Sequence, residues 1–235
     1  RITKHVKDQN WFAVGIDFFI VVVGVFIGIQ VSNWNADQQQ SALGKAYLSR
    51  MTDDLVAMES YLDEKLSRSQ ANLDLAKKLL QAASAQGFQD DTLIAATEDY
   101  FTDGWVTPQF TIIDAVYQDM SATGNLNLLD DSLRQQITTY YARLDRVQEV
   151  MEVSRDWSLP IDSQIILEHD VYRWNRDFFY LLSADDEALK QKTILGARKE
   201  LARLATLYIW IERDSLSQFE DSLHATRDLI VAIDG

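Results

Sequence analysis

The residues that could perform catalysis or bind a metal are few and scattered. The three histidines, His5, His169 and His224, lie far apart and form no His-Glu-x-x-His or Glu-x-x-His motif. Only the Glu-His-Asp stretch at 168–170 gathers metal-ligating types, and successive helical residues point in different directions, so they cannot all face one ion. There is no Gly-x-Ser-x-Gly motif and no cysteine. We therefore expect no catalytic residue, no metal site and no cofactor, and we predict that the protein is not an enzyme.

One group of residues in the apolar stretch 12–31 has a spacing that indicates a function. Asp17, Val21, Gly24 and Gly28 fall at i, i+4, i+7 and i+11, so they share one stripe of a helix. The two glycines form a GxxxG motif, which lets a second helix approach closely inside a membrane. A carboxylate about 7.5 Å inside the apolar stretch is costly unless it faces a partner or water. We predict a helix-packing stripe; the alternative is that Asp17 reaches the headgroups or binds a proton.

The stretch 12–31 has the length of a membrane span. Its twenty residues include one charge, and as a helix they extend about 30 Å, which matches the hydrocarbon core of a bilayer. Trp11 and Trp34 bracket it and are expected to anchor it at the two interfaces. The main competing interpretation is a cleaved signal peptide. Its apolar core would be shorter, however, and Trp34 disrupts the small-residue pattern before the obvious cleavage site after Ala36.

The basic residues around the span predict its orientation. Three precede it, whereas two occur in the twenty residues that follow, and the more basic flank usually remains in the cytoplasm. We therefore expect residues 1–11 to be a short cytoplasmic tail, residues 12–31 to cross the bacterial inner membrane once, and residues 32–235 to form a periplasmic helical domain.

The remainder of the chain is strongly acidic. Beyond Val31 there are 19 basic and 34 acidic residues. Such a surface repels phosphate backbones, so nucleic acid is excluded as a partner, and anionic headgroups are disfavoured for the same reason. The absence of cysteine excludes disulfides but does not identify the compartment.

Composition and periodicity predict an all-α domain. Nine glycines and two prolines favour long helices. The 3-and-4 spacing of apolar residues over 36–85 predicts a stalk helix that continues from the span, with a kink expected near 67–72, where the apolar stripe weakens. A shorter helix should follow, capped by Asp90 or Asp91 and ending at Gly104.

Three further helices are predicted after Gly104. The first should open at Thr107-Pro108 and end at Gly124, and the second should be capped by Asp130 or Asp131 and stop at Leu159-Pro160. The last should run from about 187 to 233 and return antiparallel beside the stalk. Together they describe a transmembrane helix, a stalk and an antiparallel bundle.

An aromatic run precedes the last helix. At helical spacing its side chains surround most of the circumference, so the segment is either central packing in the bundle or a patch that another protein covers. The residues of this candidate interaction patch are Tyr172, Trp174, Phe178, Phe179 and Tyr180.

Two stretches resemble a known family. They are VGVFIGIQVSNWN at the end of the apolar anchor, and TPQF followed by SATGNLNLLDDSLRQQITTYY. The combination resembles a family of uncharacterised bacterial single-span membrane proteins with an N-terminal anchor and a helical extracytoplasmic domain. The resemblance implies this architecture and topology, and it implies no chemistry.

These observations lead to one expected function and one alternative. We expect a non-enzymatic accessory or scaffold subunit, anchored in the lipid bilayer, that packs its span and periplasmic domain against a larger inner-membrane protein complex, with respiratory and photosynthetic complexes as candidate hosts. The alternative is a periplasmic four-helix sensor or a self-associating tether, with the GxxxG motif as the seam of a homodimer. The sequence contains no second apolar run long enough to span a membrane, so a sensor would need to signal through a partner or through sequence that precedes residue 1.

Overall fold

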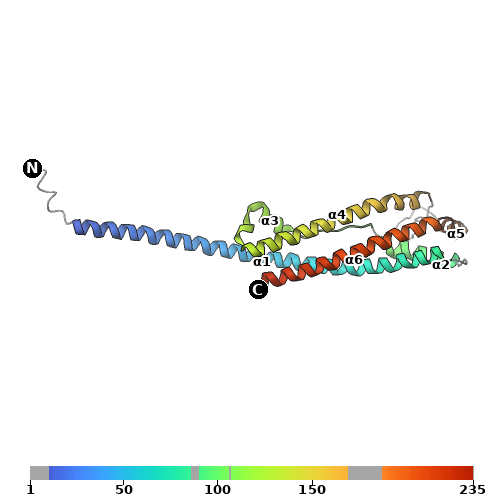
Figure 1. Ribbon diagram of the computed structural model, residues 1–235, viewed down its shortest axis with the longest axis horizontal. Coiled ribbons are helices and arrows are strands. Elements are labelled where there is room, and N and C mark those ends of the chain that lie inside the picture. The colour runs from blue at the N-terminus through green and yellow to red at the C-terminus, as the bar shows by residue number, and fades with distance from the viewer. Residues whose placement is uncertain (1–10, 86–89, 106, 169–186, 235) are drawn as a thin grey trace, which may run out of the picture.

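A computed structural model describes residues 11–85, 90–105, 107–168 and 187–234, with the side chains of 11–13, 166–167 and 187–190 excluded (Figure 1). All regular secondary structure within these ranges is helical, which confirms the predicted all-α class. One long helix extends through the molecule, and the other helices pack against its C-terminal part, so its N-terminal part projects alone (Figure 1).

The long helix, α1 (Trp11–Ser84), contains 74 residues and is about 110 Å long. The predicted continuation of the apolar anchor into the stalk is thus confirmed. By length and composition its N-terminal part could cross a membrane, and none of its most apolar window is buried. From Gly44 onward one face is buried. The core residues on this face include Tyr47, Met51, Leu55, Met58, Leu62, Leu73, Ala76 and Leu79.

The last helix, α6 (Arg198–Asp234), returns antiparallel beside α1, as predicted. Three contacts show the direction, because the residue number in α6 falls from one contact to the next while the residue number in α1 rises. Arg227 Nε lies 2.6 Å from Glu59 Oε1 near the end of α6. Asn72 Nδ2 donates to Glu212 Oε1 at 3.1 Å near its middle, and Arg198 Nη1 donates to the Ala82 carbonyl at 3.3 Å at its start.

The third long helix, α4 (Asp131–Glu168), also lies antiparallel to α6. The Tyr140 hydroxyl is 2.9 Å from Thr226 Oγ1, and the Tyr208 hydroxyl donates to Asp162 Oδ2 at 2.8 Å. Helices α1 and α4 therefore run in the same direction and α6 runs against both. The bundle is antiparallel, as the sequence predicted.

The connection from α1 to α4 is only partly helical. It contains α2 (Asp90–Asp99), the π-helical turn η1 (Tyr100–Gly104), α3 (Ala115–Thr123) and the 3-10 turn η2 (Asn125–Leu128). The end of α3 is as predicted, because Gly124 has φ of 73°, a left-handed conformation that favours glycine.

The predicted start of this helix at Thr107-Pro108 is wrong, because residues 107–114 are irregular and α3 begins only at Ala115. Tertiary contacts hold this segment against α1. The Thr111 backbone N–H donates to the Tyr61 hydroxyl at 3.0 Å, and Lys65 Nζ donates to the carbonyl of residue 109 at 3.2 Å. These bonds use backbone groups that a helix would pair internally, so the extended path is satisfied without a helix.

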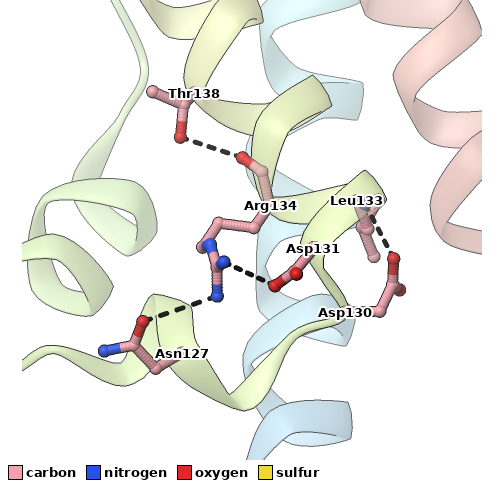
Figure 2. Close-up of polar contacts among 6 residues, drawn as sticks. All are labelled: Asn127, Asp130, Asp131, Leu133, Arg134 and Thr138. Carbon is pink, nitrogen blue, oxygen red and sulfur yellow. Dashed lines mark hydrogen bonds and ion pairs between the residues drawn. The ribbon is translucent and has the colours of Figure 1, made fainter.

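The start of α4 follows the predicted capping chemistry. Asp130 Oδ1 accepts a hydrogen bond of 2.9 Å from the Leu133 backbone N–H, so Asp130 is the N-cap (Figure 2). Arg134 bridges Asp131 and Asn127, which ties the first turn of α4 to η2 (Figure 2). The Asn-Leu-rich connection is thus fixed on the helix that it introduces.

The predicted end of this helix at Leu159-Pro160 is wrong, because α4 continues to Glu168 with Pro160 inside it. An internal proline removes one helical hydrogen bond and costs about 3 kcal/mol in an isolated helix. Beyond it, however, Asp162 and Ile165 are both buried against the bundle. Their packing requires the helix to continue.

The final helix is also divided. The sequence predicted one helix over 187–233, whereas the structure has α5 (Glu187–Gly196) and α6, with Ala197 between them. The Ala197 N–H remains bonded to Thr193 O at 3.1 Å and to Ile194 O at 3.2 Å. The break is therefore a local tightening at Gly196.

Two hydrophobic clusters form the core, and a polar layer separates them. The cluster nearer the apolar anchor gathers α1, α3, α4 and the end of α6 around Met58, Ile137 and Phe219. The distal cluster gathers the end of α1, α2, η1 and the start of α6 around Leu79 and Leu204. Between them α1 buries Ser69 and Asn72 and is helical without interruption. The apolar stripe weakens over 67–72 because α1 meets buried polar groups of α6 there. The kink expected at 67–72 stays a prediction, since the helix is continuous through these residues.

Candidate functional site

The predicted packing stripe has no partner within the described part of the chain. Asp17, Val21, Gly24 and Gly28 are all exposed, and a Cβ atom built on either glycine would meet nothing within 4 Å. Trp34 is exposed, while the side chain of Trp11 lies outside the described residues. Helix α1 therefore presents the stripe to its surroundings along its whole length.

The stripe and the bundle use different sides of α1. At about 100° per residue, the mean direction of the stripe is roughly opposite to that of the buried residues Met51, Leu55 and Met58. A helix lying on the stripe would thus meet α1 on the side away from α6. The arrangement leaves room for lateral packing in the apolar region without displacing the bundle.

The aromatic run Tyr172, Trp174, Phe178, Phe179 and Tyr180 lies outside the described residues. The structure does contain another exposed aromatic pair, Trp157 of α4 and Trp210 of α6. Their rings stack with centroids 5.5 Å apart, and their side chains are 56% and 50% exposed, next to Val153 at 50%. Sequence reasoning missed this pair because the two tryptophans occupy the polar faces of separate helices and only their antiparallel packing brings them together.

The polar layer centres on Glu212, which is only 6% exposed. Asn72 Nδ2 donates to its carboxylate at 3.1 Å, and the Ser69 hydroxyl hydrogen bonds to it as well. Burial raises the pKa of Glu212 above its usual range despite these bonds and the more distant charges of Lys65 and Arg68. Asn72 Oδ1 accepts no hydrogen bond from the described residues. The sequence signal for this layer was the weak stripe at 67–72.

A second buried carboxyl lies in the distal cluster. Asp162 is 4% exposed and accepts the Tyr208 hydroxyl hydrogen bond. Burial raises its pKa, while hydrogen bonds from Tyr208, Trp105 and Ser158 act in the opposite direction. Burial also raises the pKa of Tyr208 and of the adjacent Tyr100, so both hydroxyls stay protonated. This cluster fixes the packing of α4 on α6.

The candidate metal ligands are not gathered in the described residues. Among these, no group of three or more His, Cys, Asp or Glu side chains could hold a metal ion. His224 is exposed on α6, whereas His5 and His169 lie outside the described ranges. The lack of a catalytic or metal site therefore stays a prediction for the chain as a whole.

Comparisons with known proteins found no match of any kind. No family model, no curated protein and no solved structure matches the chain. The resemblance to bacterial single-span membrane proteins with a helical extracytoplasmic domain therefore remains a prediction.

Proposed function

We propose that this protein is a non-enzymatic, membrane-anchored accessory subunit whose single span packs against a helix of a larger inner-membrane complex. In this proposal residues 1–11 are cytoplasmic, residues 12–31 cross the membrane, and the helical domain from residue 32 stands in the periplasm against the same complex. The observation that carries the proposal is the stripe of Asp17, Gly24 and Gly28, which has no partner among the described residues.

The chemistry of the stripe favours a different chain as its partner. In a parallel homodimer the Asp17 carboxylates of the two copies would approach each other, and like charges in an apolar medium repel strongly. A partner helix with a lysine or arginine at the same depth would neutralise Asp17, and small residues beside Gly24 and Gly28 would allow close packing. The partner is thus a basic, glycine- or alanine-bearing transmembrane helix.

The extracytoplasmic domain offers a second contact to the same partner. The stacked Trp157–Trp210 pair with Val153 exposes large apolar side chains, which are enriched at protein interfaces. Helix α1 rises about 20 Å from Val31 to Gly44 before the bundle begins. This free segment places the bundle above the membrane surface, where it can lie against a partner that also protrudes.

The experiment is gentle solubilisation of native membranes, isolation of the tagged full chain, and quantitative mass spectrometry of what accompanies it. The wild type is compared with Gly24→Leu/Gly28→Leu and with Gly15→Leu/Val22→Leu, whose side chains lie on the other side of the same helix. We expect a membrane partner in fixed ratio with the wild type and the control, and at least tenfold less of it with the stripe variant. Equal recovery with all three, or recovery of this chain only, would overturn the proposal.

A further inference from the structure

The polar layer contains a small cavity between α1, the irregular segment 107–109 and α6. Its polar interior consists of Ser69, Asn72, Glu212 and Ser215, and Met151 of α4 and Phe219 of α6 form its apolar wall. Lys65 and Arg68 line it from one side of α1, with Lys65 partly buried and Arg68 exposed. The cavity therefore has an acidic interior and a basic rim.

Among the described residues, no positive charge contacts Glu212 in the interior, although Lys65 and Arg68 act on its carboxylate from farther away. No lysine or arginine of the described residues lies within salt-bridge distance, 4 Å, of its carboxylate, which accepts hydrogen bonds from the neutral Ser69 and Asn72 side chains instead. A buried carboxylate is costly without a counter-charge. Asn72, 4% exposed, also retains an acceptor, Oδ1, without a donor among the described residues. Both features call for a group that carries a positive charge and several N–H donors.

The rim of the cavity, in contrast, favours a negatively charged group. Lys65 Nζ is held at the mouth by its 3.2 Å bond to the carbonyl of Gln109, and Arg68 has no salt bridge within 4 Å among the described residues. A guanidinium and an ammonium side by side attract a carboxylate. A simple cation would satisfy the interior but would be repelled by this rim, and a simple anion would meet the reverse conflict.

We propose that this cavity binds the zwitterion of a small α-amino acid, with its ammonium group toward Glu212 and its carboxylate toward Arg68 and Lys65. Size restricts the ligand. The space open to water-sized atoms is about 30 Å³, enough for about two waters, so the ammonium group and Cα enter while the carboxylate stays at the rim. Glycine and alanine fit this description, and a branched or aromatic side chain would meet Met151 and Phe219.

The inference is independent of the membrane partner. It concerns the bundle alone, about 60 Å from the end of the apolar anchor along α1, and it holds whether or not the span has a partner. It also gives the bundle a function that the anchoring proposal does not supply, namely recognition of a small solute.

Isothermal titration of the full chain in detergent micelles tests the proposal. The probes are glycine, alanine and leucine, together with methylamine and acetate as the two half-ligands, at constant ionic strength. We expect one glycine or alanine bound per chain, with leucine, methylamine and acetate each at least tenfold weaker. No heat from glycine or alanine up to about 10 mM at two temperatures, which excludes binding with zero enthalpy at one of them, would show that the cavity does not bind these amino acids and would overturn the proposal.

Three variants locate the binding. Glu212→Gln keeps the shape of the side chain and removes its charge, so glycine affinity should fall at least tenfold. Arg68→Gln alters an exposed residue and should weaken glycine severalfold without loss of folding, which keeps the test valid if Glu212→Gln unfolds. Lys78→Gln removes an exposed charge elsewhere on α1 and should change nothing. Full affinity in both Glu212→Gln and Arg68→Gln would refute the assigned orientation and the site.

Discussion

Replacement of Gly104 by alanine should destabilise the bundle although the change adds only a methyl group. A Cβ atom at this position, the end of η1, would lie 2.9 Å from both Cβ and Cδ1 of Leu75 and 3.2 Å from Cδ2 of Tyr100. Because Cβ of Leu75 is fixed to the backbone of α1, rotation of the leucine side chain relieves only one of the two closest contacts. The helix and the π-helical turn must therefore separate.

The expected cost follows from overpacking of a filled core. Such insertions typically cost about 1–3 kcal/mol, and for a domain of this size each kcal/mol corresponds to about 2–4 °C in melting temperature. We expect Gly104→Ala to unfold about 2–12 °C below the wild type by circular dichroism of the full chain in detergent. The matched control is Gly196→Ala, since a Cβ atom there would meet nothing within 4 Å; alanine should be neutral or stabilising by up to about 1 kcal/mol.

The result that would refute this reasoning is a Gly104→Ala melting temperature equal to or above that of the wild type. It would mean that η1 and α1 are not in direct contact at Leu75, and that Gly104 acts only as the helix stop that the sequence predicted. A large loss in the Gly196→Ala control would instead contradict the open space found around a Cβ atom at Gly196.

Two further predictions concern charge and capping. Burial places the folded-state pKa of Glu212 and Asp162 above their ordinary values of 4.5 and 3.8. Their contribution to stability is therefore fully present below those values and is lost as pH rises through the raised pKa. The free energy of unfolding from urea titrations should fall over this window, and less steeply in Glu212→Gln; an unchanged slope in that variant would contradict the assignment. Asp130→Ala removes the cap on the Leu133 N–H and should lower the free energy of unfolding by about 0.5–2 kcal/mol. Asp131→Ala loses only an exposed ion pair and should lower it by less than about 1 kcal/mol. Equal losses of stability in thermal melts would argue against the cap.

Local rules account for much of the architecture. The apolar length of 12–31, the 3-and-4 spacing over 36–85 and the scarcity of glycine and proline were enough to predict a single helix that carries the anchor into the stalk. A cap at Asp130 or Asp131 and a stop at Gly124 were likewise readable, because each acts on backbone groups within a few residues. These signals depend on neighbours in the chain, so the sequence contains them completely.

Two of the wrong predictions share a physical cause. Pro160 stays inside α4 because Asp162 and Ile165 must reach the distal cluster. Residues 107–114 stay irregular because Tyr61 and Lys65 of α1 hydrogen bond to backbone groups of this segment. In each case a contact with a distant element outweighed a local preference.

The candidate sites also differ in whether the sequence alone could predict them. The stripe of Asp17, Gly24 and Gly28 was visible in the sequence because one helix defines it. The polar layer was visible only as a gap in the apolar stripe at 67–72, since its meaning depends on Glu212, which α6 brings back from far along the chain. Hydrophobic periodicity records which face of a helix is buried, whereas the antiparallel register of α1 and α6 decides which buried groups meet.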